Sequence, residues 1–147
     1  MNVLYVFVRE LNSMSHGKAL AHSGHAAAHF VANHHFRSGE YNEVNDWVGE
    51  ASGFGTQINL SASDEDIFKA IKLADEKGFI NSLIWDPTYP YDVNDEIVNL
   101  LPAKLHTDLA VQITPDTWRC FRKEWTAAYI FGDKDKLRPI VGEFPLA

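Results

Sequence analysis

Lys18 is the first candidate for chemistry, because its position is unusual for a cation. It falls in the first turn of a predicted helix, directly after a predicted strand, where its charge opposes the positive end of the helix dipole. Backbone N–H groups at a helix start already favour an anion, and a lysine beside them suits a phosphate or a developing oxyanion. The alternative interpretation is a solvated surface lysine.

Asp86 is the second candidate, because it closes the strand predicted at residues 79–85. In open α/β sheets, binding sites form just beyond the carboxyl ends of the strands. If the strands before Lys18 and Asp86 are parallel neighbours, both side chains open onto one rim of the sheet. A lysine–carboxylate pair there can activate a water molecule or hold an ester. The alternative is that Asp86 only caps the turn at Pro87.

Three histidines, His22, His25 and His29, have spacings that place them on one face of the same helix. Histidines at such spacings can bind zinc. No acidic general base lies between them, unlike the helix of a metalloprotease. The preferred interpretation places His25 in the core with hydrogen bonds and His22 near the site as a polar group. We therefore expect no metal.

A basic segment near the end of the chain alternates with aromatic residues. Arginine among aromatics is typical of surfaces that contact RNA. The same pattern arises when the aromatic residues are buried and the charges are solvated, and both interpretations stay open. The residues are Arg119, Arg122 and Lys123 with Trp118, Phe121 and Trp125.

Apolar periodicity and turn formers predict the elements that position these residues. Residues 86–90 are predicted as a loop, since two prolines interrupt regular structure there. Gly24 inside the first helix costs about 1 kcal/mol relative to alanine, and we expect close approach to a sheet to compensate. Strands are predicted at residues 3–8, 54–60, 79–85, 107–113 and 126–131. Helices are predicted at 18–32 with Ser15 as N-cap, at 44–48, from 61 to the stop at Gly78, at 95–100, and as a turn within 137–146.

Composition and length favour one domain. The chain has 147 residues, of which 46% are hydrophobic and 22% charged, which excludes a disordered or fibrous protein. The single cysteine, Cys120, has no partner for a disulfide and favours a reducing compartment. There is no signal-peptide pattern and no apolar run that could span a membrane, so we expect a cytoplasmic location. The net charge of −7 argues mildly against an acidic partner such as RNA unless the surface is polarised.

Three blocks of the sequence resemble one family. Residues 14–26 read MSHGKALAHSGHA and follow a strand that ends in Val8 and Arg9. Residues 63–86 form an acid-capped helix, a glycine stop and a strand that ends in aspartate. Residues 126–132 and 141–146 make a weaker third match. This pattern resembles the type 2 peptidyl-tRNA hydrolases, whose signature is Met-Ser-x-Gly-Lys, Ala-Ala-Gln and His-Ala after a strand ending in Val-Arg.

The resemblance implies an enzyme that cleaves the ester joining peptide to tRNA, without metal or cofactor, and usually as a homodimer. Together with the element order, it gives a single-domain α/β fold over residues 1–147. Its sheet would be mixed, mostly parallel and covered by helices on both faces, with an insertion at about 87–125. Lys18 would contact tRNA phosphate or the ester, Asp86 would orient water, and Thr126 would complete the catalytic set. Substrate-binding residues would be Ser15, Gly17, His22, His25 and Thr88.

The sequence departs from the family pattern in ways that bear on activity. His22 replaces the family's glutamine, and the loop after Asp86 carries Pro87 and Thr88 in place of Ala-Gly-x-Thr. Thr107 competes with Thr126 for the second threonine, and Thr126 is preferred because the tail follows it at family-like spacing. A non-catalytic module that binds tRNA, a nucleotide or a protein on the same scaffold is therefore the rival hypothesis.

Overall fold

Strand β1 (Asn2–Val8) forms the centre of the sheet. Its residues 3–7 are all buried, as expected for a short apolar run rich in β-branched and aromatic side chains. It pairs with the parallel strand β2 (Gln57–Leu60) along one edge and with the antiparallel strand β5 (Thr117–Asp133) along the other. The computed structural model describes residues 1–11, 14–35, 43–50, 55–94 and 110–147.

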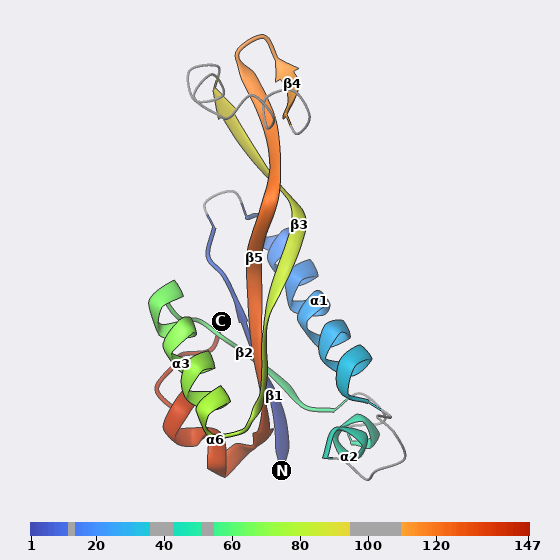
Figure 1. Cartoon of the computed structure of the whole chain (residues 1–147), viewed down its shortest axis with the longest axis vertical. Coiled ribbons are helices and arrows are strands. Elements are labelled where there is room, and N and C mark those ends of the chain that lie inside the picture. The colour runs from blue at the N-terminus through green and yellow to red at the C-terminus, as the bar shows by residue number, and fades with distance from the viewer. Residues whose placement is uncertain (12–13, 36–42, 51–54, 95–109) are drawn as a thin grey trace. The chain divides into compact units, whose positions relative to one another are not determined.

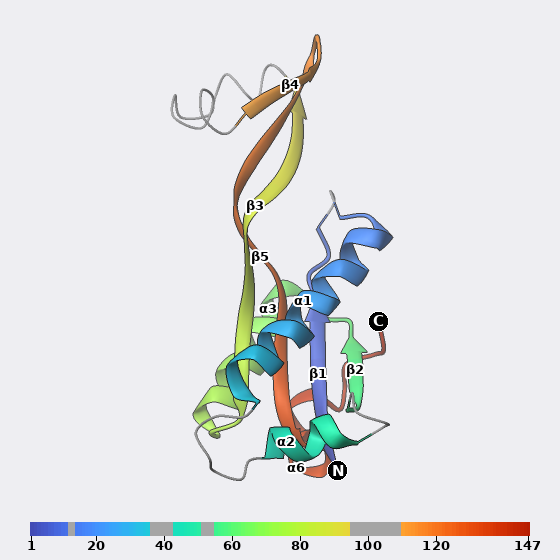
Figure 2. The same cartoon turned by 90° about the vertical axis from the view of Figure 1, so that its right-hand side faces the viewer.

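The sheet has five strands in the described residues, with the order β2-β1-β5-β3 and with β4 paired to β5. Strand β3 (Ile80–Asn94) lies at the end of this order, and β4 (Ala110–Thr114) forms an antiparallel hairpin with β5. Figures 1 and 2 show β3 running opposite to β5. The pair β1–β2 is therefore the parallel pair of a mostly antiparallel mixed sheet.

The prediction of a mostly parallel sheet covered by helices on both faces is wrong. Helices connect β1 to β2 and β2 to β3, but of these two strand pairs only β1 and β2 are neighbours in the described sheet, because β1 and β5 lie between β2 and β3. The chain returns from β3 through β4 and the hairpin into β5, which makes the later pairs antiparallel. Helices flank only part of the sheet, since no helix is described between residues 85 and 125.

Four helices are described: α1 (His16–His34), α2 (Glu43–Gly49), α3 (Asp64–Glu76) and α6 (Lys134–Val141). Figures 1 and 2 show α1 and α2 on one side of β1, and α3 and α6 on the other. Polar N-caps start three of them: Ser15 caps α1, Ser63 caps α3 and Asp133 caps α6. In the described residues, none of these helices has both the length and the apolar character needed to cross a bilayer.

An aromatic cluster forms the core between the sheet and the helices α1 and α2. Phe30 of α1 lies against Trp47 of α2 and against Phe131 of β5, with ring centroids 5.3 Å and 4.7 Å apart. Trp47 donates its indole N–H to the carbonyl of Thr56 at 2.8 Å. These contacts fix α1 across the sheet.

The opposite core uses smaller side chains from α3. Ile67, Ala70 and Ala74 are buried and follow one another at the spacing of one helix face. Leu137 of α6 is fully buried, and Phe144 of the tail makes an edge-to-face contact with Phe7 at 5.5 Å. Both faces of β1 are therefore packed.

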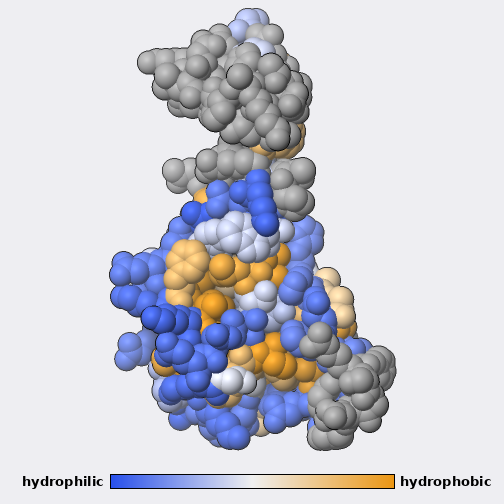
Figure 3. All heavy atoms as spheres, in the orientation of Figure 1, coloured by the Kyte–Doolittle hydropathy of each residue, from blue (hydrophilic) through white to orange (hydrophobic). Residues whose placement is uncertain are grey.

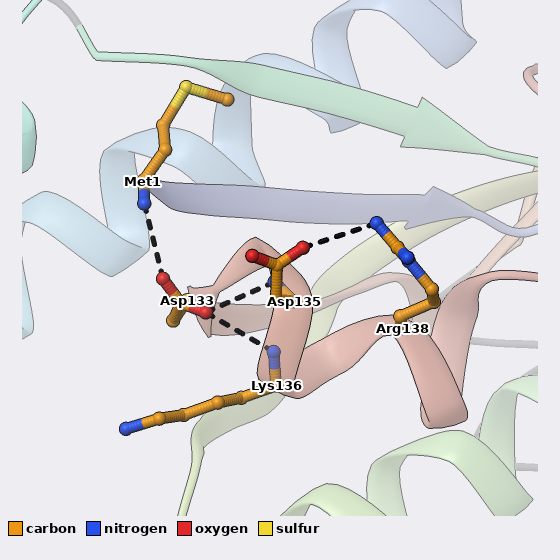
Figure 4. A network of polar contacts seen from close by, with 5 residues as sticks. All are labelled: Met1, Asp133, Asp135, Lys136 and Arg138. Carbon is orange, nitrogen blue, oxygen red and sulfur yellow. Dashed lines mark hydrogen bonds and ion pairs between the residues drawn. The ribbon is translucent and has the colours of Figure 1, made fainter.

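Asp133 connects the N-terminus to the start of α6 (Figure 4). Its carboxylate accepts hydrogen bonds from the backbone N–H of Asp135 at 3.1 Å and of Lys136 at 3.2 Å, and from the N-terminal ammonium of Met1 at 3.1 Å. These hydrogen bonds, above all the one to the N-terminal ammonium, hold the pKa of Asp133 below its ordinary value. The same residue therefore ends β5, begins α6 and holds the start of β1.

The described chain divides into two compact units. The first contains Met1–Glu10, Met14–Ile84 and Thr126–Ala147, and the second contains Leu11–Ser13 and Trp85–Trp125. Strands β3 and β5 run through both units. The segment 87–125, predicted as an insertion in a single domain, falls within the second unit, and its status as an insertion stays a prediction.

Several predicted elements differ from the structure. Residues 86–90 are strand rather than loop. Because β3 is an edge strand, a proline whose nitrogen points away from β5 removes no ladder hydrogen bond. The strand predicted at 126–131 begins earlier, at Thr117. Gly24 is exposed and has no atom within 4 Å of a Cβ built on it, so no close approach compensates for it. The helix predicted at 95–100 lies outside the described residues.

We predict opposite effects for alanine at two glycines. Gly55 has a φ of +58°, and a Cβ there would overlap the indole of Trp47, so Gly55→Ala should destabilise the protein by about 2 kcal/mol. Gly24→Ala, in an open helical position, should stabilise it by about 0.5–1 kcal/mol. Urea unfolding of the two variants against the wild type measures both. Equal stability of the two variants would contradict this packing.

Candidate functional site

The start of α1 provides a cation beside free helical donors. Ser15 adopts an extended backbone conformation, and its hydroxyl accepts a hydrogen bond from the backbone N–H of Lys18 at 3.2 Å, which confirms the predicted N-cap. The N–H groups of His16 and Gly17 have no acceptor within the helix. No acidic residue lies in this first turn, and the side chain of Lys18 is partly exposed. This arrangement favours an anion.

Thr126 lies at the C-terminal end of β1. Its carbonyl accepts a hydrogen bond from the backbone N–H of Arg9 at 2.9 Å, one residue beyond the strand. Its side chain is 0% exposed, and its hydroxyl has no hydrogen-bond partner among the described residues. A buried hydroxyl without a partner is costly, so such groups in native proteins often serve a function.

Lys18 and Thr126 belong to the same end of the first unit. Figures 1 and 2 show that α1 begins beyond the C-terminal end of β1. Thr126 pairs with Arg9 at that same end. The start of α1 and Thr126 therefore lie at the same end of β1. The alternation of side chains along β5 places Thr126 on the face opposite Ala127 and Tyr129, which pack in the core beneath α1.

A partly buried ion pair lies at this end too, and sequence reasoning missed it. The guanidinium of Arg9 contacts the carboxylate of Asp64, in the first turn of α3, at 3.0 Å. The hydroxyl of Ser61 donates a hydrogen bond to Glu10 at 3.3 Å. Arg9 has only 18% of its side chain exposed. One signal in the sequence points to this ion pair: Arg9 follows a predicted strand, and Asp64 lies at the start of a predicted helix.

Asp86 does not occupy the predicted position. It lies within β3, which continues to Asn94, rather than at the end of a strand. Strand β5 lies between β1 and β3, so the strands before Lys18 and Asp86 are not neighbours. Asp86 belongs to the second unit and Lys18 to the first, and their pairing remains a hypothesis from the sequence.

The structure says little about the other two candidate threonines, Thr88 and Thr107. Thr88 lies in β3, in the second unit, and its side chain is outside the described part of the structure. Thr107 lies outside the described residues altogether. Of the three competing threonines, Thr126 is the one whose surroundings the structure describes.

The histidines do not converge on one point. His22 is buried and His25 is exposed, so the predicted burial of His25 is wrong; the two rings meet edge to face with centroids 5.2 Å apart. His29 instead directs Nδ1 at the hydroxyl of Tyr129, 2.9 Å away. Among the residues that the structure describes, no cluster of histidine, cysteine and acidic side chains could hold a metal ion.

The hydroxyl of Tyr129 is an unexpected polar group in the core. Tyr129 is 0% exposed, and its hydroxyl lies 2.9 Å from His29 and 3.5 Å from Nε2 of His34. Burial raises the pKa of Tyr129 to about 12, against a smaller opposing effect of a hydrogen bond with Ser82. The tyrosine therefore stays neutral and anchors one face of α1 to β5.

A cavity of about 810 Å³ opens elsewhere, between α3, α6 and the tail. Its apolar lining includes Leu73 and Phe144, and its charged lining includes Asp66 and Arg138. None of the residues predicted to form the site lines it. The candidate chemistry and this cavity are therefore separate features of the first unit.

Comparison with known proteins gives the fold without a function. No protein-family model and no curated protein matches the chain. Among solved structures, the chain is similar to a protein of unknown function from Agrobacterium tumefaciens, with a TM-score of 0.51 and 11% identity over 99% of this chain and 97% of that chain. At this identity the similarity concerns the fold alone, so any function must be argued from the site.

The buried hydroxyl of Thr126 leads to a stability prediction. Thr126→Val keeps the branched shape and removes a polar group without a partner, so it should stabilise the protein by about 1 kcal/mol. Ser23→Ala is the matched control, because the buried Ser23 hydroxyl lies 3.0 Å from Gln57 and 3.1 Å from Asn59. That variant should destabilise. Thermal unfolding compares them, and destabilisation by Thr126→Val would indicate a missed partner.

The raised pKa of Tyr129 predicts a loss of stability at high pH. The folded pKa of about 12 exceeds the ordinary value of 10.0, so the contribution is complete below pH 10.0 and is lost as pH rises toward 12. The loss should be about 2–3 kcal/mol. Unfolding in urea across this range should show a shallower decline for Tyr129→Phe. Parallel declines for wild type and variant would exclude Tyr129 as the cause.

Proposed function

We propose that this chain is a peptidyl-tRNA hydrolase that acts in the cytoplasm without a cofactor. The observation that carries the proposal is the cationic start of α1, where Lys18 stands beside helical N–H donors at the same end of β1 as the buried hydroxyl of Thr126. The resemblance of residues 14–26 to the family signature adds to it.

The chemistry of ester hydrolysis suits such a site. Water attacks the ester carbonyl, a negative charge develops on its oxygen, and the bond to the ribose oxygen breaks as that oxygen takes a proton. Helical N–H groups and an ammonium are the donors that stabilise such an oxyanion or a nearby tRNA phosphate. The family resemblance gives Thr126 a place in the catalytic set, although its hydroxyl is fully buried in this structure. Ser15 caps α1, and Gly17 belongs to its first turn. His22 and His25 lie further along the same helix.

The proposed role of Asp86 is supported by the sequence alone. A carboxylate that orients water is the role that the family resemblance gives it, together with Thr88 as a substrate contact.

A homodimer is the proposed assembly. Strand β3 is an edge strand, and along its first-unit part Ile80 and Leu83 are only half-buried. Figure 3 shows apolar side chains at the surface between α3 and α1, where Figures 1 and 2 show β3 nearest the viewer. An open edge beside an apolar surface favours association with a second copy.

The second candidate is a non-catalytic module that binds tRNA through the same anion site. It is favoured by the position of Asp86 inside β3, in a different unit from Lys18. Binding of tRNA without cleavage of the ester by the wild type would decide for this module.

The test is release of labelled peptide from a purified peptidyl-tRNA. Lys18→Ala should lower kcat/KM by about 10²–10³-fold, which is the effect of removing one oxyanion donor. Thr126→Val should lower it despite its expected gain in stability, and Asp86→Asn should lower it if the carboxylate orients water. Lys72→Ala, an exposed lysine of α3, is the matched control and should have the wild-type rate.

Two further arms complete the experiment. A chelator should leave the rate unchanged, because the proposed chemistry uses no metal. Wild-type rates for both Lys18→Ala and Thr126→Val would remove the start of α1 from the mechanism.

A further inference from the structure

The basic and aromatic residues of the second unit alternate along β5. Successive strand residues point to opposite faces, so Arg119, Phe121 and Lys123 share one face. Arg119 and Lys123 are exposed, whereas Phe121 is partly exposed and Trp125 is buried. The sequence left two interpretations open: an RNA-contact surface, or solvated charges beside buried aromatic residues. Trp125 fits the second interpretation, whereas Arg119, Phe121 and Lys123 remain compatible with the first.

Trp85 of β3 lies on the same face. Its side chain is 49% exposed, which is unusual for the largest apolar residue, and the ammonium of Lys123 lies 5.2 Å from the centre of its ring. This cation–π contact orients the tryptophan beside the cation. We call Trp85, Arg119, Phe121 and Lys123 the Trp85 strip; all four belong to the second unit.

We propose that the Trp85 strip binds single-stranded RNA. Flat aromatic rings beside cations are the combination on which unpaired bases stack while the phosphates meet positive charge. Arg119 and Lys123 are four residues apart, or about 13 Å along the strand. One cation therefore lies on each side of the partly exposed Phe121. A duplex offers no unstacked base to Trp85, which favours a single strand.

This proposal goes beyond ester hydrolysis, because it uses neither Lys18 nor Thr126. It also answers the objection that a net charge of −7 disfavours RNA, since a local basic strip is sufficient for phosphate contact.

The test is fluorescence anisotropy of a labelled oligouridylate of about twelve nucleotides, within the range that single-strand binding surfaces occupy. Trp85→Leu should raise Kd by about 5- to 150-fold, which is the loss of one stacked base. Lys123→Ala and Arg119→Ala should each weaken binding, and Lys134→Ala, an exposed lysine of α6 in the first unit, should not.

Salt dependence gives a second readout. Two cations should give a slope of log K against log salt of about −1.4, and Lys123→Ala should reduce it to about −0.7. Lys72→Ala, an exposed lysine of α3 in the first unit, should leave both the affinity and the slope unchanged. Circular dichroism checks that each variant is folded.

Three results would overturn the proposal. The first is no binding by the wild type, and the second is equal binding by wild type, Trp85→Leu and Lys123→Ala. The third is equal affinity for an RNA duplex of the same length, because stacking on Trp85 would then be unnecessary.

Discussion

Burial of β1 on both faces is the constraint on which the rest of the first unit depends. Leu4 has Gln57 of β2 as its partner on one edge and Phe131 of β5 on the other, so the strand has no open edge there. Full burial of a large apolar side chain contributes about 1.5–3 kcal/mol, and five successive residues of β1 are buried. The strand cannot shift by one residue without exchanging both of its faces. Its C-terminal end is therefore a fixed point in the fold.

That fixed point determines what the candidate site can contain. The chain leaves β1 at Arg9, whose backbone N–H binds the carbonyl of Thr126 and whose guanidinium binds Asp64. The turn capped by Ser15 then starts α1 at the same end. The aromatic contacts of Phe30 hold α1 across the sheet further along. At this position the Thr126 hydroxyl is buried without a partner among the described residues, which costs about 1–3 kcal/mol.

Local features of the fold could be predicted from the sequence. The cap at Ser15, the stop at Gly78 with its φ of +80° and the inward face of α3 each depend on residues within one or two turns. Strand direction could not be predicted, because a short apolar run reads the same in either direction. Asp86 was misplaced for a related reason: its neighbouring prolines indicate a loop unless the strand is known to be at an edge. His22 is buried and His25 is exposed, the reverse of the prediction, because the sequence does not show how α1 is rotated about its axis. Contacts such as the hydrogen bond between Asn59 of β2 and Ser23 determine that rotation.

The central claim is that the start of α1, at the end of the sheet that carries Thr126, meets the scissile group of the substrate. The most direct measurement follows backbone amide chemical shifts of the labelled protein while a peptidyl-tRNA analogue is added in which an amide replaces the ester. The account predicts that the largest changes occur at Gly17, Lys18 and Thr126. Changes confined to other parts of the chain, with none at the start of α1, would contradict it.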